Sequence, residues 1–351
     1  MKNSDLIKYV DKLIEKLAGL TSKEWAQNIN AWDWNPGVGL MGVVRAAEVI
    51  QKNEYKEFLE KWFERNVENR WFGSVNNVAP ANVPLYLAKQ NTDSIYKEIA
   101  DEYFDWCVNK SVRTTNNGFG HVWEDKISGT IGLPDYKNQL WVDSIYMTCI
   151  FLVKYGLYYK NEEAIKLALE QSKIHTQCLF CEEEDLIFHA YHCIDNENLG
   201  QHWGRGNGWF VVTLAELILH LQGTEYDIDY LKEIFVRVMN RVLSMREADG
   251  MIHTLIDVKE SYKETTGSLL CCYAALIGYK CGILGKEFVE WADDLITTVI
   301  EMLDENDMNL LYCSGGTGPE SKETYMATKF SDTLYANGLV IQLFAERTIT
   351  D

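Results

Sequence analysis

The chain has 351 residues, 47% of them apolar, including 11 Trp, 19 Tyr and 13 Phe. It can therefore fill a large core and still leave aromatic rings to stack on a flat ligand such as a sugar. Its formal net charge of −19 argues against nucleic acid or an anionic membrane as a partner, because both favour a basic face.

The first twenty residues predict an amphipathic helix and no export signal. Leu6, Val10, Leu13, Ile14 and Leu17 recur at helical spacing between charged residues, without the continuous apolar stretch of a signal peptide. No window is long and apolar enough to span a bilayer. The nine scattered cysteines suit reduced thiols. We therefore expect a cytoplasmic protein. We also expect a monomer or a homodimer.

Six segments of the chain begin with polar or small residues and continue as nearly all-apolar helices. Their predicted starts are Trp34, Val75, Trp141, Gly206, Thr265 and Ser331. A helix that is apolar all round must be covered on every side. The segments between them, such as 161–174 and 227–243, have one apolar stripe and one charged face, which is typical of covering helices.

This alternation predicts an all-α fold, an (α/α)6 barrel in which six inner helices are surrounded by six outer helices. An irregular helical bundle or a solenoid is the alternative. No linker or low-complexity stretch marks a boundary, so we expect residues 1–351 to form one domain. In such a barrel the starts of the inner helices share one mouth.

Asp143 lies within the apolar stretch "NQLWVDSIYMTCIFLV", at the start of the third predicted inner helix. A helix N-cap is the simplest explanation for a carboxylate at this position. However, Trp141, Tyr146 and Met147 enclose it with apolar surface, which predicts a raised carboxyl pKa suited to a general acid. A two-carboxylate glycosidase would need a second acid. Candidates near other helix starts are Asp33, Asp125, Asp135, Glu264 and Asp332, and none stands out.

The stretch "QHWGRGNGWF" combines glycines with one arginine between two indoles. Three glycines within residues 204–208 let the backbone approach a ligand closely. Arg205, between Trp203 and Trp209, offers a fork for a carboxylate and flat faces beside it. No Gly-Lys-Ser/Thr follows, so this is no phosphate loop. We interpret it as a receptor for a uronic acid, with a Gly-rich connector and core tryptophans as the alternative.

Histidines and cysteines give weaker signals. His121 and His189 precede inner helices and can hydrogen-bond the hydroxyls or carboxylate of a ligand, although a structural role is the alternative. Cys178 and Cys181 form a lone C-x-x-C. Zinc needs four ligands at workable spacing, so we predict no metal site.

Five short stretches together resemble a known family. "NQLWVDSIYM", "FHAYH", "HWGRGNGWF", "KETTGS" and "GGTG" occur in the order and at the spacing of the unsaturated glycuronyl hydrolases of glycoside hydrolase family 105, typified by unsaturated rhamnogalacturonyl hydrolase. "WDWNPGVGLMGVVRA" fits the first inner helix of that family. The resemblance spans Trp32 to Glu346. It implies an (α/α)6 barrel and a cytoplasmic enzyme without metal or cofactor, which acts on short unsaturated oligosaccharides left by polysaccharide lyases.

The resemblance also implies a reaction, the hydration of the 4,5-double bond of a terminal unsaturated uronic acid. Asp143 takes the place of the general acid, which then acts as a base. Arg205, Trp209 and His189 match positions that hold the uronate and its hydroxyls. Further pocket residues are expected at Trp34, His121, Trp141, Trp203, Asn207 and Thr266.

One departure from the family concerns the second inner helix. Many members carry a second Asp at its start, where this chain has Asn76 and Asn77. We expect Asn77 to be the equivalent catalytic position, with Asn76 next. An amide can hydrogen-bond a substrate or a water molecule but cannot ionise.

Two other classes of function fit the same residues. The first is another sugar-active enzyme on this fold, either a two-carboxylate glycosidase or a sugar epimerase. The second is a carbohydrate-binding protein without catalytic activity. A second carboxylate facing Asp143 would favour the glycosidase, and binding without turnover would identify the third class.

Overall fold

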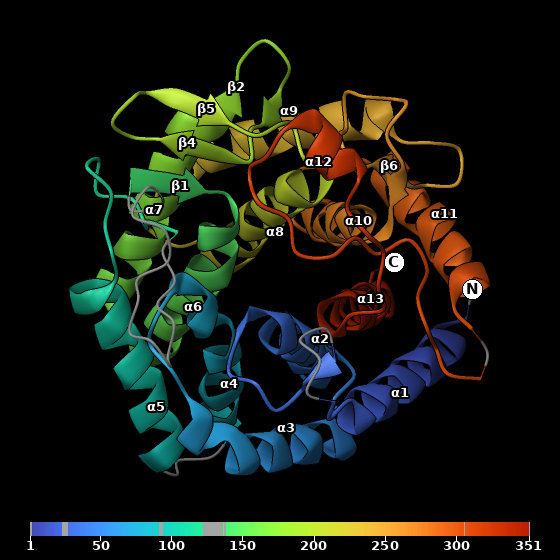
Figure 1. Cartoon of the computed structure of the whole chain (residues 1–351). Helices are drawn as coiled ribbons and strands as arrows, with labels where there is room; N and C mark the ends of the chain where they lie inside the picture. The colour runs from blue at the N-terminus through green and yellow to red at the C-terminus, as the bar shows by residue number, and fades with distance from the viewer. Residues whose placement is uncertain are drawn as a thin grey trace.

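The computed structural model of the chain describes residues 2–22, 27–90, 94–121, 136, 138–304 and 306–350. Asp125 and Asp135, two of the candidate second acids, lie outside these residues. Figure 1 looks along the axis of a ring of helices arranged in two concentric layers. The predicted (α/α)6 fold is confirmed by this arrangement.

The inner layer is a closed ring of helices whose apolar surface faces its neighbours in every direction. Each inner element contacts the next, from α2 through η3, α6, α8 and α10 to α13, which packs back on α2. Its members are α2 (Trp34–Val49), η3 (Val75–Ala81) continuing as α4 (Asn82–Gln90), α6 (Asp143–Tyr159), α8 (Gly204–Leu221), α10 (Thr265–Lys280) and α13 (Leu334–Arg347).

The outer layer covers the ring with amphipathic helices. In α1 the five apolar residues predicted to form one stripe are all buried, which confirms that expectation. The outer helices are α1 (Asn3–Gly19), α3 (Asn53–Asn66), α5 (Ser94–Asp105), α7 (Glu162–Leu179), α9 (Asp229–Met245) and α11 (Lys286–Met302). The short segments η2 (Val67–Asn69) and η4 (Trp106–Lys110) extend α3 and α5.

Short strands and one short helix decorate the end of the barrel where the inner helices begin. Strands β1 (Gln139–Trp141), β4 (Ala190–His192) and β5 (Glu197–Leu199) form an antiparallel sheet in the order β1-β4-β5. The pairs β2 (Phe180–Cys181) with β3 (Leu186–Ile187) and β6 (Ile252–His253) with β7 (Lys263–Glu264) are two-stranded. The short helix is α12 (Lys322–Met326).

Several predicted helix starts are displaced by a few residues. Trp141 belongs to β1, and the third inner helix starts at Asp143, because Trp141 pairs with Ala190 of β4. The second inner helix opens with a 3₁₀ segment. The fourth starts at Gly204 rather than Gly206, and the sixth at Leu334 rather than Ser331.

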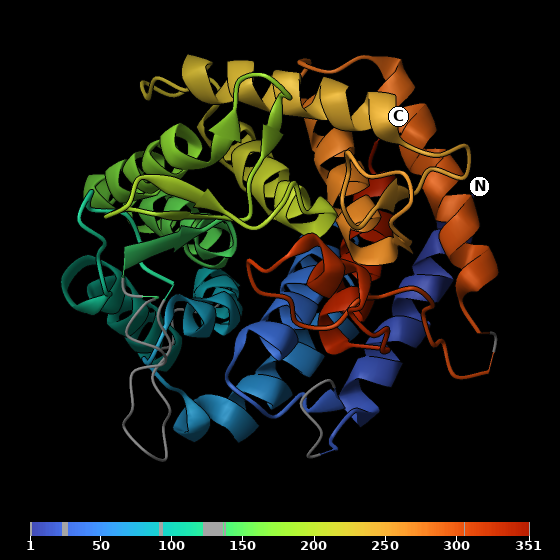
Figure 2. The same ribbon diagram turned by 45° about the horizontal axis from the view of Figure 1, so that its top comes forward.

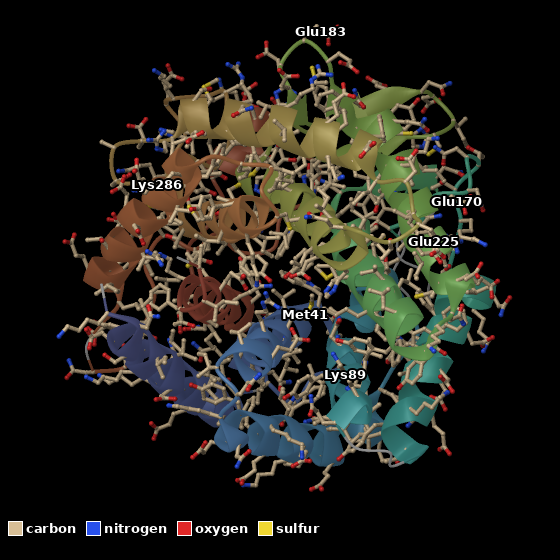
Figure 3. All side chains as sticks on the ribbon, turned by 180° about the vertical axis from the view of Figure 1, so that it is seen from behind. Met41, Lys89, Glu170, Glu183, Glu225 and Lys286 are labelled. Carbon is tan, nitrogen blue, oxygen red and sulfur yellow. The ribbon has the colours of Figure 1, made fainter. Side chains whose placement is uncertain are left out.

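Close packing of the inner ring requires glycine where α2 crosses α13. A Cβ atom added to Gly42 would collide with the backbone of Gly338, so the two helices approach at a distance that no side chain allows. The view from behind shows Met41 of α2 near the centre of the ring and Glu170, Glu183 and Lys286 at its rim (Figure 3). In the described part of the chain, no helix has the length and apolar character needed to cross a bilayer.

Candidate active site

A cavity of about 240 Å³ opens at the end of the barrel where the inner helices begin. Pockets that hold drug-sized ligands measure roughly 300–1,000 Å³, so this smaller cavity suits a ligand near the size of one sugar ring. The segment that carries α12 lies in front of the inner helices beside the strands (Figure 2). The cavity is lined by Trp34, Asn76, His121, Trp141, Asp143, Met147, Trp203, Arg205, Trp209, Gly316, Thr317 and Gly318.

The strand pair β1 and β4 brings Asp143 to His189. Trp141 pairs with Ala190, and the backbone N–H of Val142 donates to the carbonyl of His189 at 3.0 Å. Asp143 is then the first residue of α6, and no side chain caps this helix. The N-cap explanation of Asp143 is therefore wrong, because residue 142 occupies the cap position and the carboxylate is directed elsewhere.

The carboxylate of Asp143 faces the imidazole of His189. Asp143 Oδ2 lies 3.3 Å from His189 Nε2, with side-chain exposures of 16% and 0%. Among the described residues, neither atom has a partner in hydrogen-bond geometry. The two groups are thus held at contact distance without a hydrogen bond between them in the free protein.

The pKa of Asp143 differs from the sequence expectation. Burial raises this pKa as predicted, but His189 and then His121 favour the ionised form, and the net pKa is lowered. The predicted raised pKa is therefore wrong for the free protein. The apolar wall could be recognised in the sequence, whereas the imidazole beside it comes from a distant segment.

His121 contributes a neutral polar group to the cavity. Its ring stacks on Trp141 with centroids 4.3 Å apart, and its Nδ1 lies 3.1 Å from Ser144 Oγ. Burial lowers the pKa of His121 to about 4, although the charge of Asp143 raises it. At neutral pH this imidazole can exchange hydrogen bonds with a hydroxyl without adding charge.

Arg205 is 1% exposed and holds one wall of the cavity in place. Its Nη1 donates to Ser314 Oγ at 2.6 Å, and its Nη2 donates to the Gly315 carbonyl at 2.7 Å and to Thr317 Oγ1 at 3.3 Å. The guanidinium also lies 4.4 Å from the centroid of Trp203. The fork expected for a ligand carboxylate is thus engaged by the "GGTG" stretch. Arg205 brings a cation to the lining, and the buried carboxylate of Glu264, 3.6 Å from Nη1, balances part of its charge.

Four indoles make the remaining walls largely flat and apolar. Trp209 packs on Tyr146 with ring centroids 4.3 Å apart, and Trp34 packs on Tyr335 at 5.0 Å. Trp203 stacks on His189 at 4.3 Å. Its Nε1 is buried without a hydrogen-bond partner among the described residues. Flat faces with a free N–H donor match the surface of a pyranose ring.

Asn76 lines the cavity and Asn77 does not. The side chain of Asn77 accepts from the Ser74 backbone N–H at 2.9 Å and donates to the Trp32 carbonyl at 3.0 Å, completing a capping box at the start of η3. The expectation that Asn77 faces the reaction is therefore wrong, because both amide atoms of Asn77 bond the backbone, and the amide that reaches the cavity is that of Asn76.

Three further expected binding residues are also outside the lining: the fully buried His189, which contacts Asp143 from behind the cavity wall, and Asn207 and Thr266. The Asn207 side chain bonds the backbone N–H and carbonyl of Ile187. Thr266 Oγ1 donates to the Glu264 carboxylate at 2.8 Å. Both side chains are fully buried and support the residues that do reach the cavity.

The candidate second acids in the described residues have structural partners. Asp33 caps α2 through the Trp34 backbone N–H, and its pKa is raised by burial. Glu264 caps α10 and accepts from the Ser314 backbone N–H. Asp332 pairs with Lys16 at 2.6 Å. Among the described residues, the cavity lining therefore contains one carboxylate, that of Asp143.

Sequence reasoning missed Tyr325 altogether. This tyrosine is fully buried, and its hydroxyl lies 2.6 Å from His189 Nδ1. It stands outside every motif, so no local signal marks it. Met147 was recognised only as part of the wall near Asp143, whereas the "GGTG" stretch that supplies Gly316, Thr317 and Gly318 had been singled out.

The arrangement can bind and protonate a small anionic ring. One carboxylate can exchange a proton, Arg205 provides positive charge, and the indoles provide stacking faces. No group of three or more His, Cys, Asp or Glu side chains within the described ranges is placed to hold a metal ion.

Comparisons with known proteins find relatives of the chain. The model of Glycosyl Hydrolase Family 88 matches residues 7–350. The unsaturated rhamnogalacturonyl hydrolase YesR of Bacillus subtilis (strain 168) is 24% identical over 321 residues, covering 90% of this chain and 89% of that protein.

Solved structures share the fold. A possible member of the GH105 family from Salmonella enterica superposes with a TM-score of 0.89 and 21% identity, covering 99% of this chain and 94% of the other. The unsaturated glucuronyl hydrolase of Bacillus sp. GL1, responsible for the degradation of glycosaminoglycan, superposes with a TM-score of 0.72 and 15% identity. The match covers 97% of this chain and 96% of the other.

Proposed function

The chain belongs to Glycosyl Hydrolase Family 88, and from this premise we propose that it releases a terminal 4,5-unsaturated uronic acid from lyase-generated oligosaccharides. The family match and the fold confirm the resemblance to family 105 that the motifs indicated. The chain is thus a glycoside hydrolase. Its substrate and the role of each residue are our proposal.

The observation that carries the proposal is the single carboxylate of the described cavity lining. A retaining or inverting glycosidase needs two carboxyl groups on opposite sides of the glycosidic bond. Hydration of an alkene needs one group that first gives a proton and then accepts one. One acid, a cationic side chain and stacking indoles suit the second reaction.

In the proposed reaction the Asp143 carboxyl gives its proton to C4 of the unsaturated ring. The electron pair of the C4–C5 double bond forms the C4–H bond, and the ring oxygen stabilises the positive charge left on C5. Water then adds to C5 while its proton passes to the Asp143 carboxylate. The resulting hemiketal opens to a ketone at C5, and C1 becomes an aldehyde as the next sugar leaves as an alcohol.

Ligand binding supplies the protonated form of Asp143 that this reaction needs. In the free protein the pKa of Asp143 is lowered by His189 and His121 against the effect of burial. A uronate carboxylate that enters the same cavity adds a like charge and displaces water, and both effects raise a carboxyl pKa. Because kcat reports the pKa values of the complex with substrate, we expect kcat to fall as the pH rises through this raised pKa, with an optimum below pH 7.

Asn76 is the second polar group proposed to act on the reaction. Its amide lines the cavity and can hold the attacking water, but it cannot take up a proton. Asp143 alone must therefore handle both proton transfers. The relative YesR is named for unsaturated rhamnogalacturonyl substrates, so an unsaturated rhamnogalacturonan disaccharide is the first substrate to test.

The test is incubation with a panel of unsaturated disaccharides from pectic, ulvan-type and glycosaminoglycan sources. Turnover removes the double bond and its ultraviolet absorbance. We expect loss of absorbance with the wild-type protein, and about 10³- to 10⁴-fold slower loss with Asp143→Asn, since general acid–base groups contribute about 10²–10⁴ each and Asp143 acts in two steps. Binding of the disaccharide, measured by calorimetry, should survive this substitution.

Asp257→Asn is the matched control. Asp257 also pairs with a histidine, His202, at 2.8 Å, but it does not line the cavity. This variant should keep wild-type rates. Binding without turnover by the wild-type protein on every disaccharide would instead identify a carbohydrate-binding protein.

A further inference from the structure

The segment from Cys313 to Ser331 folds back on itself beside the cavity and carries Tyr325. Its ends are joined where the Ser331 N–H donates to the Cys313 carbonyl at 2.9 Å and Ser314 pairs with Phe330. Within α12, Tyr325 is the buried residue. The segment therefore sends one side chain inward while the rest of this short helix faces outward.

The phenol of Tyr325 is fitted to His189. Its hydroxyl lies 2.6 Å from His189 Nδ1, and both side chains are buried. Gly200 makes room for it: this residue has a φ of +78°, and a Cβ atom there would lie 2.6 Å from the Tyr325 hydroxyl. Two features of the backbone thus keep the position beside His189 open for a hydroxyl.

The imidazole of His189 is held on all sides. Its ring stacks on Trp203 with centroids 4.3 Å apart and meets Trp141 edge-on at 5.5 Å. Its backbone N–H donates to the Gln201 carbonyl at 3.2 Å. With the ring fixed and Nδ1 next to the phenol, Nε2 lies 3.3 Å from Asp143 Oδ2, a contact distance that falls outside hydrogen-bond geometry in the free protein.

A neutral imidazole carries one proton, and the neighbour of one nitrogen decides where it resides. Burial raises the pKa of Tyr325, although the backbone N–H groups of Gln201 and Glu320 lower it. The phenol therefore stays protonated and can donate. A hydroxyl that donates to Nδ1 leaves the imidazole proton on Nε2.

We propose that Tyr325 is a positioning residue for the reaction at Asp143: it donates to Nδ1 of His189 and so keeps the imidazole proton on Nε2, the nitrogen that lies beside the Asp143 carboxylate. This N–H stabilises the carboxylate formed when Asp143 gives its proton to C4. It also holds the carboxylate in place for the proton of the attacking water. The kinetic part of the inference rests on the proposed function, whereas the tautomer does not.

The titratable groups around His189 come from several elements. Asp143 of α6 and Tyr325 of α12 contact the ring directly. His121, before β1, interacts electrostatically with both His189 and Asp143, and Glu320 acts on Tyr325. Tyr325 is the neighbour that lies against Nδ1, so its removal changes the tautomer without changing the charge of the site.

The first experiment measures the tautomer by nitrogen–proton NMR on the protein with isotope-labelled histidine. The wild-type His189 should carry its proton on Nε2, and Tyr325→Phe should convert it to a mixture or to the Nδ1 form. A wild-type His189 that is protonated on Nδ1 alone overturns the inference. This measurement needs no substrate, so its outcome stays separate from that of the activity test.

The second experiment compares the kinetics of two variants on a disaccharide that the wild-type protein cleaves. In Tyr325→Phe we expect kcat to fall about ten- to a hundredfold, as for partners that orient a functional histidine, while KM changes little because Tyr325 does not line the cavity. The alkaline limb of the pH profile should move to higher pH, because an unprotonated Nε2 disfavours the Asp143 carboxylate and so raises the pKa of Asp143.

Tyr262→Phe is the matched control. The Tyr262 hydroxyl donates to the backbone carbonyl of Tyr325 at 3.2 Å, so this variant loosens the same short helix without touching the phenol of Tyr325. It should leave the tautomer and the pH limb unchanged. Equal pH profiles in the two variants would mean that Tyr325 only holds its segment in place, and would overturn the inference.

Discussion

The two ends of the inner ring differ in how their buried polar groups are paired. At the mouth, Asp143 Oδ2, His189 Nε2 and Trp203 Nε1 have no hydrogen-bond partner among the described residues. At the other end, six charged side chains from five inner helices lie close together with opposite charges, although Glu216 Oε2 also lacks a hydrogen-bond partner among the described residues. They are Arg45 and Glu48 of α2, Lys154 of α6, Glu216 of α8, Lys280 of α10 and Glu346 of α13.

The pairs at the rear end hold neighbouring helices together. Arg45 Nε donates to Glu346 Oε2 at 2.8 Å, Lys154 lies 3.4 Å from Glu48, and Tyr273 donates to Glu216 at 2.5 Å. The rear view also shows Lys89 at the end of α4 (Figure 3). A buried charge without a partner is strongly destabilising. The paired charges at this end therefore indicate a structural role.

This difference indicates which end of the barrel carries the function. Both ends bury polar side chains and leave some polar atoms unpaired, but at the mouth these atoms adjoin a cavity. Leaving a buried polar atom unpaired costs about 1–3 kcal/mol. A ligand that supplies the missing partner recovers this free energy. Substitutions at the mouth should therefore change activity, and substitutions at the rear should change stability.

The largest effect on stability is expected for Arg45→Met. Removing this cation leaves Glu346 buried without its main partner, and breaking a buried pair costs about 3–5 kcal/mol. Urea unfolding should show this loss of unfolding free energy, while KM at the mouth stays unchanged. Arg65→Met on the exposed surface of α3 is the control, with unfolding like the wild type. A changed KM in Arg45→Met would mean that the two ends are coupled.

The rear end should also set the response to acid. Burial raises the pKa of Glu216, but Lys154, His220 and Arg45 together lower it by more than burial raises it. The net pKa therefore lies below the usual range of a glutamate. The pKa of Glu48 is also lowered, because Lys154 and Arg45 outweigh the effect of burial. A carboxyl whose pKa is lowered in the folded state stabilises the fold above its unfolded pKa, and this contribution is lost as the pH falls.

Thermal unfolding between pH 7 and pH 3 measures this response. The wild-type Tm should fall as the pH drops below about 4.3, the ordinary glutamate value. Glu216→Gln should be less stable at pH 7, and its Tm should approach that of the wild type at low pH. Parallel Tm curves would place the acid sensitivity elsewhere. Asp143, whose pKa is also lowered, contributes in the same direction, so Asp143→Asn is measured alongside.

The smallest effects separate two adjacent amides at the start of η3. Asn77→Ala removes one half of a capping box and should lower the unfolding free energy by about 1 kcal/mol with little change in rate. Asn76→Ala should lower kcat/KM by up to about tenfold, the value of one hydrogen bond of about 1 kcal/mol, and leave unfolding unchanged. If the two variants exchanged these effects, the assignment of Asn76 to the cavity would be wrong.

Much of the fold followed from local patterns. The all-round apolar character of the inner segments predicted their burial, and the stripe in α1 predicted its outward position. The ends of the helices were less accurate, because a cap or a strand pairing decides them. Trp141 looked helical from its neighbours, yet it pairs with Ala190 of β4, a contact that periodicity does not contain.

The site was predicted in part. Asp143 and Arg205 stood out because a lone carboxylate and a lone arginine in apolar surroundings each need an explanation, and both line the cavity. Asn77 was chosen over Asn76 incorrectly, because neighbouring amides look alike until the backbone decides which of them caps the helix. Tyr325 carries no signal in the sequence, since its partner His189 is 136 residues away.

Local patterns were sufficient to predict a barrel of helices, because each segment carries its hydrophobic periodicity within its own residues. They were also sufficient to place one acid and one arginine among indoles. The direction of the Asp143 pKa, the engagement of Arg205 by the "GGTG" stretch and the contact of Tyr325 with His189 became visible with the folded chain. These properties depend on distances through space between segments far apart in the chain, and electrostatic and hydrogen-bond energies are set by those distances.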